Sequence, residues 1–372
     1  MERIGSFRVL DAAVPEERSL WHELLRSWPG REVMADPGYV QLFAREEDRV
    51  LCAAATSAGG GILFPFILRP LGAELWSSVA ERSCDIVTPY GYGGAFAWNT
   101  EPGAGDQFWD AFDAWAVQSG VVSAFARLSL FADERLAFRG GEEDALPNVV
   151  RSLELPTADV WADYAHKVRK NVAKARRSGL EARFDSTAEF LDAFLEIYGA
   201  TMDRREAAPE YHFRRDFFES LVAGLPGQFV FCHVWSQNRI VSTELVLVSA
   251  DRMYSFLGGT LAEAFDLRPN DLLKHAVVEW GIAHNKRAYV LGGGQHGEDG
   301  IFRYKQSFAP QGTVMFRVGK RVYDEQSNQR LIEQRARWEQ EQGRAWSPEA
   351  AYFPAYRART SPSVPLVTAG ES

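Results

Sequence analysis

A run of basic residues at helical spacing is the feature of this sequence that most directly suggests chemistry. Six of the eleven residues from 167 to 177 are Lys or Arg, although the 372-residue chain has a formal net charge of −9. Such a stripe suits the phosphates of a partner such as tRNA, and a solvated helix face is the alternative. Four of the six would form one continuous stripe on a helix: Lys167, Lys170, Lys174 and Arg177.

A second candidate site follows a short apolar strand near position 290. Gly292 and Gly293 come directly after this strand, and glycines there let another molecule approach the backbone closely. Tyr304 and Lys305 lie just beyond the glycine-rich loop. The Lys305 ammonium could stabilise the oxyanion that forms when an amine attacks an ester or thioester. A surface lysine beside a glycine-rich turn is the alternative.

Two carboxylates stand in apolar surroundings. Glu244 interrupts the apolar run 240–248, and Asp85 lies just before Pro89-Tyr90-Gly91. A carboxylate inside an apolar strand costs free energy unless it faces a polar site or a charged partner. We expect Glu244 or Asp85 to orient an amine or accept its proton. A buried ion pair with an arginine is the alternative for each.

Arginines next to aromatic residues form a further group of candidates. Such pairs suit phosphate or carboxylate groups of a substrate, although a structural salt-bridge cluster is the alternative. An aromatic residue in a strand also often belongs to the core. The candidate substrate-binding residues of this kind are Arg204, Arg205, Tyr211 and Tyr254.

The remaining composition excludes several classes of protein. The three cysteines are far apart and odd in number, and the seven histidines lack metal-ligand spacing, so we expect neither a disulfide framework nor a metal site. Attack of an amine on an ester or thioester implies no tightly bound organic cofactor. The negative charge weighs against a DNA-coating protein. No run approaches the roughly 20 apolar residues of a membrane helix. The first residues lack a basic-then-apolar secretory pattern, so we expect a cytoplasmic protein.

The two halves of the chain repeat one order of elements: a strand hairpin, an aromatic strand that ends in Gly-Gly, a helix and a short strand. From Gly94 to Val121 the chain advances 27 positions, and from Gly259 to Ala288 it advances 29. We interpret this as a diverged internal duplication, with coincidence between α/β elements as the alternative. We expect one domain over 1–150, a second over 151–320, and a C-terminal helix over 321–372 that packs back on the first domain and ends in a flexible tail.

A helix from Trp161 through the basic stripe would turn an apolar face toward the core of the second domain. Trp161, Tyr164, Val168, Val172 and Ala175 recur at the spacing of such a face.

Several of these residues resemble motifs of the Fem-type aminoacyltransferases. The motifs are Val168-Arg-Lys-Asn-Val-Ala-Lys-Ala-Arg-Arg-Ser-Gly179, Leu291-Gly-Gly-Gly followed by Phe302-Arg-Tyr-Lys305-Gln-Ser-Phe308, and Pro89-Tyr90-Gly91-Tyr92-Gly93-Gly94. The resemblance implies an α/β (α+β) fold of two tandem GNAT-like domains. Each domain would be a mixed, mostly antiparallel sheet flanked by helices.

The resemblance also implies a function. Fem-type enzymes build peptidoglycan cross-bridges by moving an amino acid from aminoacyl-tRNA to a peptide amine, and related proteins act in secondary-metabolite pathways. Here, Lys305 would lie at the reacting carbonyl, with Tyr304 beside it and Tyr90 in the groove between the two domains. Aminoacyl-tRNA would be the co-substrate, and a peptide or nucleoside-peptide the acceptor. The long helical arm of the staphylococcal-type members is missing, which leaves the acceptor open.

Two other functions compete with this interpretation. The second half also resembles the BioF2-like GNAT acetyltransferases, whose CoA pyrophosphate binds a glycine-bearing loop at a helix N-terminus. The equivalent segment, Asp266-Leu-Arg-Pro269-Asn-Asp271, has no glycine and places a carboxylate where phosphate would bind. This difference favours aminoacyl-tRNA over CoA. The other competitor is a catalytically inactive GNAT-like binding module, in which Lys305 and Glu244 would be replaceable.

Overall fold

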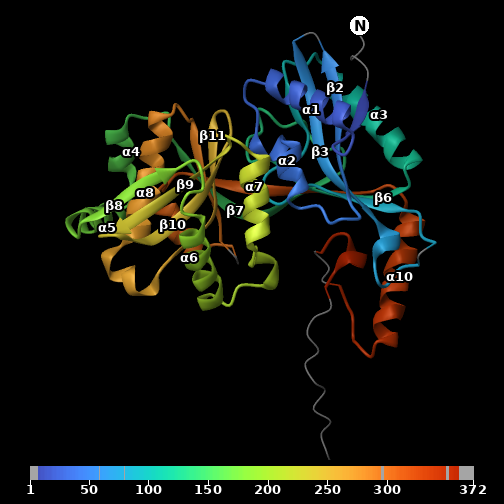
Figure 1. Ribbon diagram of the computed structural model, residues 1–372. Coiled ribbons are helices and arrows are strands. Elements are labelled where there is room, and N and C mark those ends of the chain that lie inside the picture. Colours follow the sequence, from blue (N-terminus) through green and yellow to red (C-terminus); the bar gives the residue numbers. More distant parts are fainter. Residues whose placement is uncertain (1–6, 58, 79, 295–296, 349–351, 360–372) are drawn as a thin grey trace, which may run out of the picture. The chain divides into compact units, whose positions relative to one another are not determined.

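The computed structural model describes residues 7–57, 59–78, 80–294, 297–348 and 352–359 (Figure 1). The chain divides into two compact units. The first comprises Met1–Ser27, Phe43–Glu143 and Arg317–Ser372, and the second comprises Trp28–Leu42 and Asp144–Phe316. The tip of the tail that we predict to be flexible lies within 360–372, outside the described residues.

The first unit is built on a mixed sheet whose strands follow the order β1-β2-β3-β4-β6-β13, with β5 paired to β3. The β2–β3 hairpin confirms the predicted strand pair, and it sets Ala53 opposite Phe64. Strands β4 and β6 run parallel, and the other pairs are antiparallel. The strands are β1 (Arg8–Asp11), β2 (Arg49–Ser57), β3 (Gly60–Pro70), β4 (Cys84–Val87), β5 (Phe96–Trp98), β6 (Val121–Arg127) and β13 (Thr313–Val322).

Three longer helices belong to the first unit: α1 (Pro15–Ser27), α3 (Ala104–Gln118) and α10 (Glu325–Glu341). Helix α3 buries Phe108 and Phe112 against Phe64 and Phe66, because their four-residue spacing puts both rings on one face. Helix α10 buries Leu331 in a small cluster with Leu71, Trp76, Val122 and Tyr356. The C-terminal segment is therefore part of the first unit.

The sheet of the second unit has the order β7-β12-β11-β10-β9-β8. Strands β11 and β12 are parallel and pair over Arg252–Tyr254 and Ala288–Val290, at the start of each strand. The other neighbours are antiparallel, with an irregularity between Leu245 and Val246 in β10. The strands are β7 (Gly141–Ser152), β8 (Leu180–Asp185), β9 (Phe229–Ser236), β10 (Arg239–Val248), β11 (Arg252–Thr260) and β12 (Ala288–Gly293).

Helices cover both faces of this second sheet. Neighbouring strand residues point to opposite faces, and α6 meets Phe231 through Phe194 whereas α8 meets Glu244 through Lys274. Helix α8 begins at Pro269 and packs beside α5. The helices of this unit are α2 (Pro37–Gln41), α4 (Thr157–Asp163), α5 (His166–Arg177), α6 (Leu191–Arg204), α7 (Arg215–Gly224), α8 (Pro269–Ala283) and α9 (Gly300–Gln306).

The segment Trp28–Leu42 joins the second unit through buried polar contacts. Glu32 forms an ion pair with Arg252 at 2.7 Å and accepts a hydrogen bond from the hydroxyl of Tyr254, also at 2.7 Å. The backbone N–H of Val33 donates to the Ser249 hydroxyl. These contacts place Tyr254 in the core, because its ring is buried and its hydroxyl is bonded to Glu32. The structure therefore gives Tyr254 a packing role where we expected substrate contact.

Three further expectations concern membranes, metals and disulfides. In the described part of the chain, no helix is long and apolar enough to cross a bilayer. The same residues contain no cluster of His, Cys, Asp or Glu with the arrangement of a metal site. Cys52, Cys84 and Cys232 are buried free thiols.

Candidate active site

Lys305 lies on α9, whose first turn is held by the carboxylate of Asp299. That carboxylate accepts hydrogen bonds from the backbone N–H groups of Ile301 and Phe302, at 2.8 and 2.9 Å. The Lys305 side chain is half-buried, and its Nζ donates to the carbonyl of Gly293 at 2.7 Å. The structure thus brings Lys305 to the glycine pair at the end of β12. Gly292, with a φ of +84°, adopts a backbone conformation that favours glycine.

The pKa of Lys305 is lowered to about 8. Burial is the largest cause, because removing an ammonium from water disfavours its charged form. The ammonium of Lys274 lowers the pKa further, whereas the carboxylates of Glu244 and Asp299 raise it. Lys305 is therefore mostly protonated at neutral pH and loses its proton just above the physiological range. Perturbed groups of this kind are frequent at functional sites.

Glu244 is buried in a polar cluster that joins four elements. Its Oε1 accepts hydrogen bonds from Lys274 Nζ at 2.6 Å and from the Tyr289 hydroxyl at 2.7 Å. Lys274 also donates to the Ser255 hydroxyl at 2.7 Å and to the Tyr289 hydroxyl at 3.2 Å. Burial and the neighbouring Glu244 raise the pKa of Tyr289 well above its usual value, so this phenol is neutral.

The partner of Glu244 differs from the one we considered. The predicted alternative to a catalytic role is an ion pair with arginine, but the cation is Lys274, a residue outside the predicted site. The second carboxylate oxygen, Oε2, is buried and accepts no hydrogen bond from any residue that the structure describes. A buried lysine inside the apolar run of α8 was a signal of the same kind as Glu244 itself, because neither charge is buried without a partner.

Tyr304 and the start of α8 form the adjoining wall of the site. The Tyr304 hydroxyl accepts a hydrogen bond from the Asn270 side chain at 2.8 Å. Burial raises the pKa of this phenol well above its usual value. In the same first turn of α8, the buried carboxylate of Asp271 accepts from Asn171 at 3.1 Å, and burial raises its pKa. A carboxylate thus occupies the helix N-terminus at which a phosphate would otherwise bind.

The basic stripe lies on α5. Val168, Val172 and Ala175 are buried on its inner face. The four stripe residues are exposed, and none of them forms an ion pair with another described residue. The two flanking arginines are engaged locally, because Arg169 donates to the carbonyls of Ala162 and Tyr164 and Arg176 pairs with Glu279.

The predicted single helix from Trp161 onward is wrong in one respect. Helix α4 ends at Asp163 and α5 begins at His166, because the backbone is extended at Tyr164 and Ala165. This break turns the start of α5 toward α9, and the Ala165 N–H donates to the Ser307 carbonyl at 2.9 Å. The first stripe residue, Lys167, is close enough to Asp271 to lower its pKa. The stripe therefore begins beside the segment that carries Tyr304 and Lys305.

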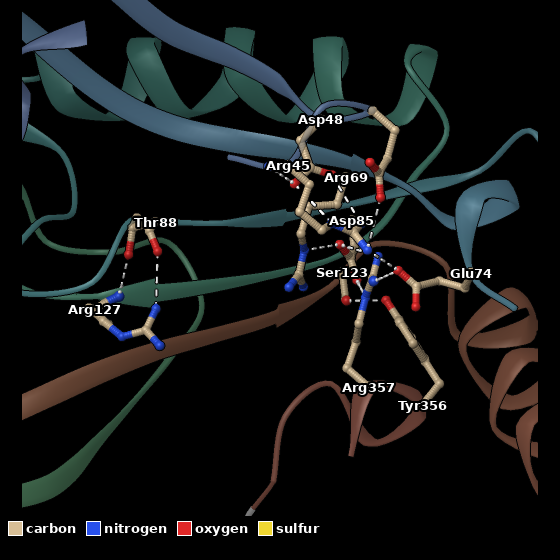
Figure 2. A network of polar contacts seen from close by, with 11 residues as sticks. Arg45, Asp48, Arg69, Glu74, Asp85, Thr88, Ser123, Arg127, Tyr356 and Arg357 are labelled. Carbon is tan, nitrogen blue, oxygen red and sulfur yellow. Dashed lines mark hydrogen bonds and ion pairs between the residues drawn. The ribbon is translucent and has the colours of Figure 1, made fainter. Parts of the chain in front are cut away.

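Asp85 lies in a separate network in the first unit (Figure 2). Its fully buried carboxylate pairs with Arg69 at 2.7 Å and with Arg357 at 2.8 Å, so both oxygens are engaged. Burial alone would raise the pKa of Asp85, but the two guanidinium groups hold it below its ordinary value. Next to Arg357, the Tyr356 hydroxyl is hydrogen-bonded to Ser123 at 2.7 Å. These contacts correspond to the arginine alternative, and they make Asp85 an anchor for the C-terminal segment.

The other predicted binding residues are spread over the two units. Tyr90, in the first unit, is exposed, and its ring lies 6.1 Å from that of Phe43. In the second unit, Arg204 contacts the Thr260 carbonyl and the Phe265 ring. Arg205 and Tyr211 are exposed. No substrate contact is assigned to these four residues by the geometry of their own units.

Comparison with known proteins gives a class and a fold. Residues 163–306 match a family model described as an acetyltransferase (GNAT) domain. The chain is similar to the structure of FemX, with a TM-score of 0.63 and 11% identity over 84% of this chain and 97% of that one. It is also similar to L-PGS from Bacillus licheniformis, with a TM-score of 0.55 and 13% identity over 90% and 98%. No curated protein sequence matches the chain.

A third similar structure is the C-terminal domain of a putative lysylphosphatidylglycerol synthetase from Agrobacterium fabrum. It has a TM-score of 0.52 and 13% identity, and the match covers 82% of this chain and 92% of that domain. The protein therefore carries a GNAT domain in its second unit, and its class is that of the acyltransferases. Its fold is the Fem-type tandem GNAT fold, as the sequence motifs implied.

Proposed function

We propose that the protein is an aminoacyltransferase that moves an amino acid from aminoacyl-tRNA to the amine of a peptide or nucleoside-peptide acceptor. The observation that carries this proposal is the arrangement within the second unit. Helix α5 presents four exposed cations that form no ion pair with another described residue, and it begins beside the α9 segment with Lys305. A 12-residue helix is ~18 Å long. A tRNA backbone can follow the stripe while its aminoacyl end lies at Lys305.

The proposed reaction is aminolysis of an ester. The neutral acceptor amine attacks the aminoacyl carbonyl, a C–N bond forms, and the carbonyl oxygen takes the negative charge. The C–O bond to the ribose then breaks, and the released hydroxyl gains a proton in place of the one that the nitrogen loses. The Lys305 ammonium stabilises the oxyanion. Glu244 or a substrate group takes the proton from the nitrogen.

Acyl-CoA is the competing donor, and the match to an acetyltransferase domain favours it. In GNAT proteins, the pyrophosphate of CoA would need the N–H groups at the start of the helix that corresponds to α8. Here Asp271 occupies that turn and Arg268 adopts a φ of +63°. A buried carboxylate at this place repels a pyrophosphate, which supports aminoacyl-tRNA as the donor.

Calorimetric titration at low salt with bulk aminoacylated tRNA and, in parallel, with acetyl-CoA tests this choice. We expect salt-sensitive tRNA binding and no CoA binding. CoA binding alone would overturn the proposal in favour of an unconventional acetyltransferase. Binding of neither ligand would favour a non-catalytic GNAT-like module. Peptide-dependent release of the amino acid from tRNA, absent in Lys305→Ala, then tests the reaction itself.

A further inference from the structure

We propose that Lys274 is a positioning residue. By pairing with Glu244, it prevents an ion pair between Glu244 and Lys305, so that Lys305 stays hydrogen-bonded to the Gly293 carbonyl. The proposal deepens the function proposed above and rests on it only in giving Lys305 a catalytic task. Lys274 itself is buried within α8 and does not need to touch a substrate.

The donors of Lys274 are fully used. A lysine ammonium has three N–H donors, and the three acceptors at 2.6, 2.7 and 3.2 Å are Glu244, Ser255 and Tyr289. Because these acceptors come from β10, β11 and β12, one cation ties together three neighbouring strands of the sheet. Such a saturated cation is fixed in place.

Glu244 differs from Lys274, because one of its acceptor oxygens receives no hydrogen bond from a described residue. Both of its described hydrogen bonds fall on Oε1, and Oε2 is buried with no partner among the described residues. A buried carboxylate oxygen without a donor attracts the nearest cation. Lys274 is already paired to Glu244, and Lys305 is a second cation close enough for the Glu244 carboxylate to raise its pKa.

Lys305 is held by a balance of charges from several elements. Lys274 on α8 repels its ammonium, whereas Glu244 on β10 and Asp299 at the start of α9 attract it. The phenols of Tyr289 and Tyr304 are neutral. Among the described residues, the Nζ of Lys305 donates only to the Gly293 carbonyl, so two N–H donors remain for an acyl oxyanion. Without Lys274, the balance would favour a Lys305–Glu244 ion pair and withdraw these donors.

The acetylation of Lys305 by trace acetic anhydride at a series of pH values tests this idea without any substrate. Only the neutral amine reacts, so the labelling midpoint follows the protonation of Lys305, and the exposed Lys167 in the same digest normalises each sample. In the wild type we expect a midpoint near pH 8. In Lys274→Met, pairing with Glu244 should move the midpoint to the usual lysine range or above, about 10.4. Labelling at pH 8 would then fall at least tenfold.

Two matched variants separate positioning from a structural role. Lys274→Arg keeps a cation on Glu244, and Lys274→Met combined with Glu244→Gln removes both the cation and the carboxylate. We expect both to label within about threefold of the wild type at pH 8, because neither leaves an unpaired carboxylate for Lys305. Where Lys274→Met does not fold, Lys274→Gln keeps a hydrogen-bond donor and gives the same comparison.

Two results would overturn the proposal. An unchanged Lys305 midpoint in a folded Lys274→Met or Lys274→Gln protein would leave Lys274 with a packing role only. A double variant that labels as slowly as the single variant would show that Glu244 is not the competitor. Because the labelling needs neither tRNA nor acceptor, a failure of tRNA binding would refute the proposed function and leave this result standing.

Discussion

The two units each bury one carboxylate on a sheet strand, and they use it in different ways. Asp85 in the first unit is 0% exposed, and both of its oxygens are paired with arginines. Glu244 in the second unit is 3% exposed, but its described partners all lie on one oxygen. A second lysine, Lys305, also lies within the field of Glu244.

This difference separates an anchor from a reactive site. Around Asp85, planar guanidinium groups satisfy the charge completely, which favours one fixed geometry. Around Glu244, the hydrogen-bonding groups are not saturated: Oε2 has no donor among the described residues, and the Nζ of Lys305 donates only to the Gly293 carbonyl among them. N–H donors that remain available at a fixed position in a buried place are what stabilises an anion that forms during a reaction. Burial of an acidic residue is therefore not enough to identify a catalytic one, and the saturation of its partners is more informative.

The largest effect should come from breaking the anchor. Replacing Asp85 by Ala leaves the half-buried Arg69 without its ion-pair partner and leaves Arg357 with Glu74 alone, and breaking a buried pair typically costs about 3–5 kcal/mol of the free energy of unfolding. Urea denaturation monitored by circular dichroism measures this loss. The C-terminal segment should also become sensitive to proteolysis. A variant as stable as the wild type would contradict the anchoring role.

The same anchor predicts a pH dependence of stability. The pKa of Asp85 is lower in the folded protein than its ordinary value of 3.8. Its stabilising contribution is therefore complete above the unfolded pKa and is lost as the pH falls through the lower, folded pKa. The wild type should lose stability below about pH 4 more steeply than Asp85→Asn.

The next largest effect concerns the reactive lysine. Lys305→Ala removes the donor to the oxyanion, which typically costs about 10²–10³ in turnover, while the urea midpoint should stay within experimental error of the wild type. Because the mechanism needs the ammonium, wild-type turnover should fall as the pH rises through about 8. Single-turnover transfer from aminoacyl-tRNA measures both effects. Full activity of Lys305→Ala would remove this residue from the mechanism.

Much of the fold and part of the site could be predicted from local sequence. The hairpins, α3, α8 and the basic face of α5 follow from the periodicity of apolar residues, which depends on neighbours in the chain. The proximity of Lys305 to Gly293 also follows from short-range order, because only 12 residues separate them. These features need no knowledge of the tertiary structure.

The partners of the two carboxylates depend on contacts that a single sequence does not encode locally. Asp85 and its partner Arg357 are 272 residues apart in the sequence. Glu244 and its partner Lys274 are 30 residues apart, and one lies on a strand and the other on a helix. The inclusion of Trp28–Leu42 in the second unit has the same origin, because it depends on Glu32 meeting Arg252. The break between α4 and α5 has no proline or glycine at Tyr164–Ala165 to indicate it.

A smaller effect should separate the exposed cations of α5 from exposed cations elsewhere in the described chain. Reversing Lys170 and Lys174 to Glu should weaken tRNA binding by about tenfold or more at low salt. The slope of log affinity against log salt should fall by roughly 2, because about 0.9 counterions are released per phosphate contact. The matched control reverses Arg26 and Arg337, two exposed arginines of the first unit, and changes the net charge equally. An equal loss of tRNA affinity in both double variants would indicate that the stripe is a solvated helix face and not a tRNA-binding surface.

The smallest effect on stability should come from removing the Glu244 pair as a whole. A combined Glu244→Gln and Lys274→Met variant leaves no uncompensated buried charge. Replacing a buried ion pair in this way is often neutral, so the free energy of unfolding should change by less than about 1 kcal/mol. Transfer should nevertheless fall, because Glu244 no longer takes part in handling the amine and its proton. Urea denaturation measures the free energy of unfolding, and single-turnover transfer on the same preparation measures the rate of the reaction. A loss of stability as large as that of Asp85→Ala, with transfer intact, would make Glu244 a second anchor and remove the distinction between the two units.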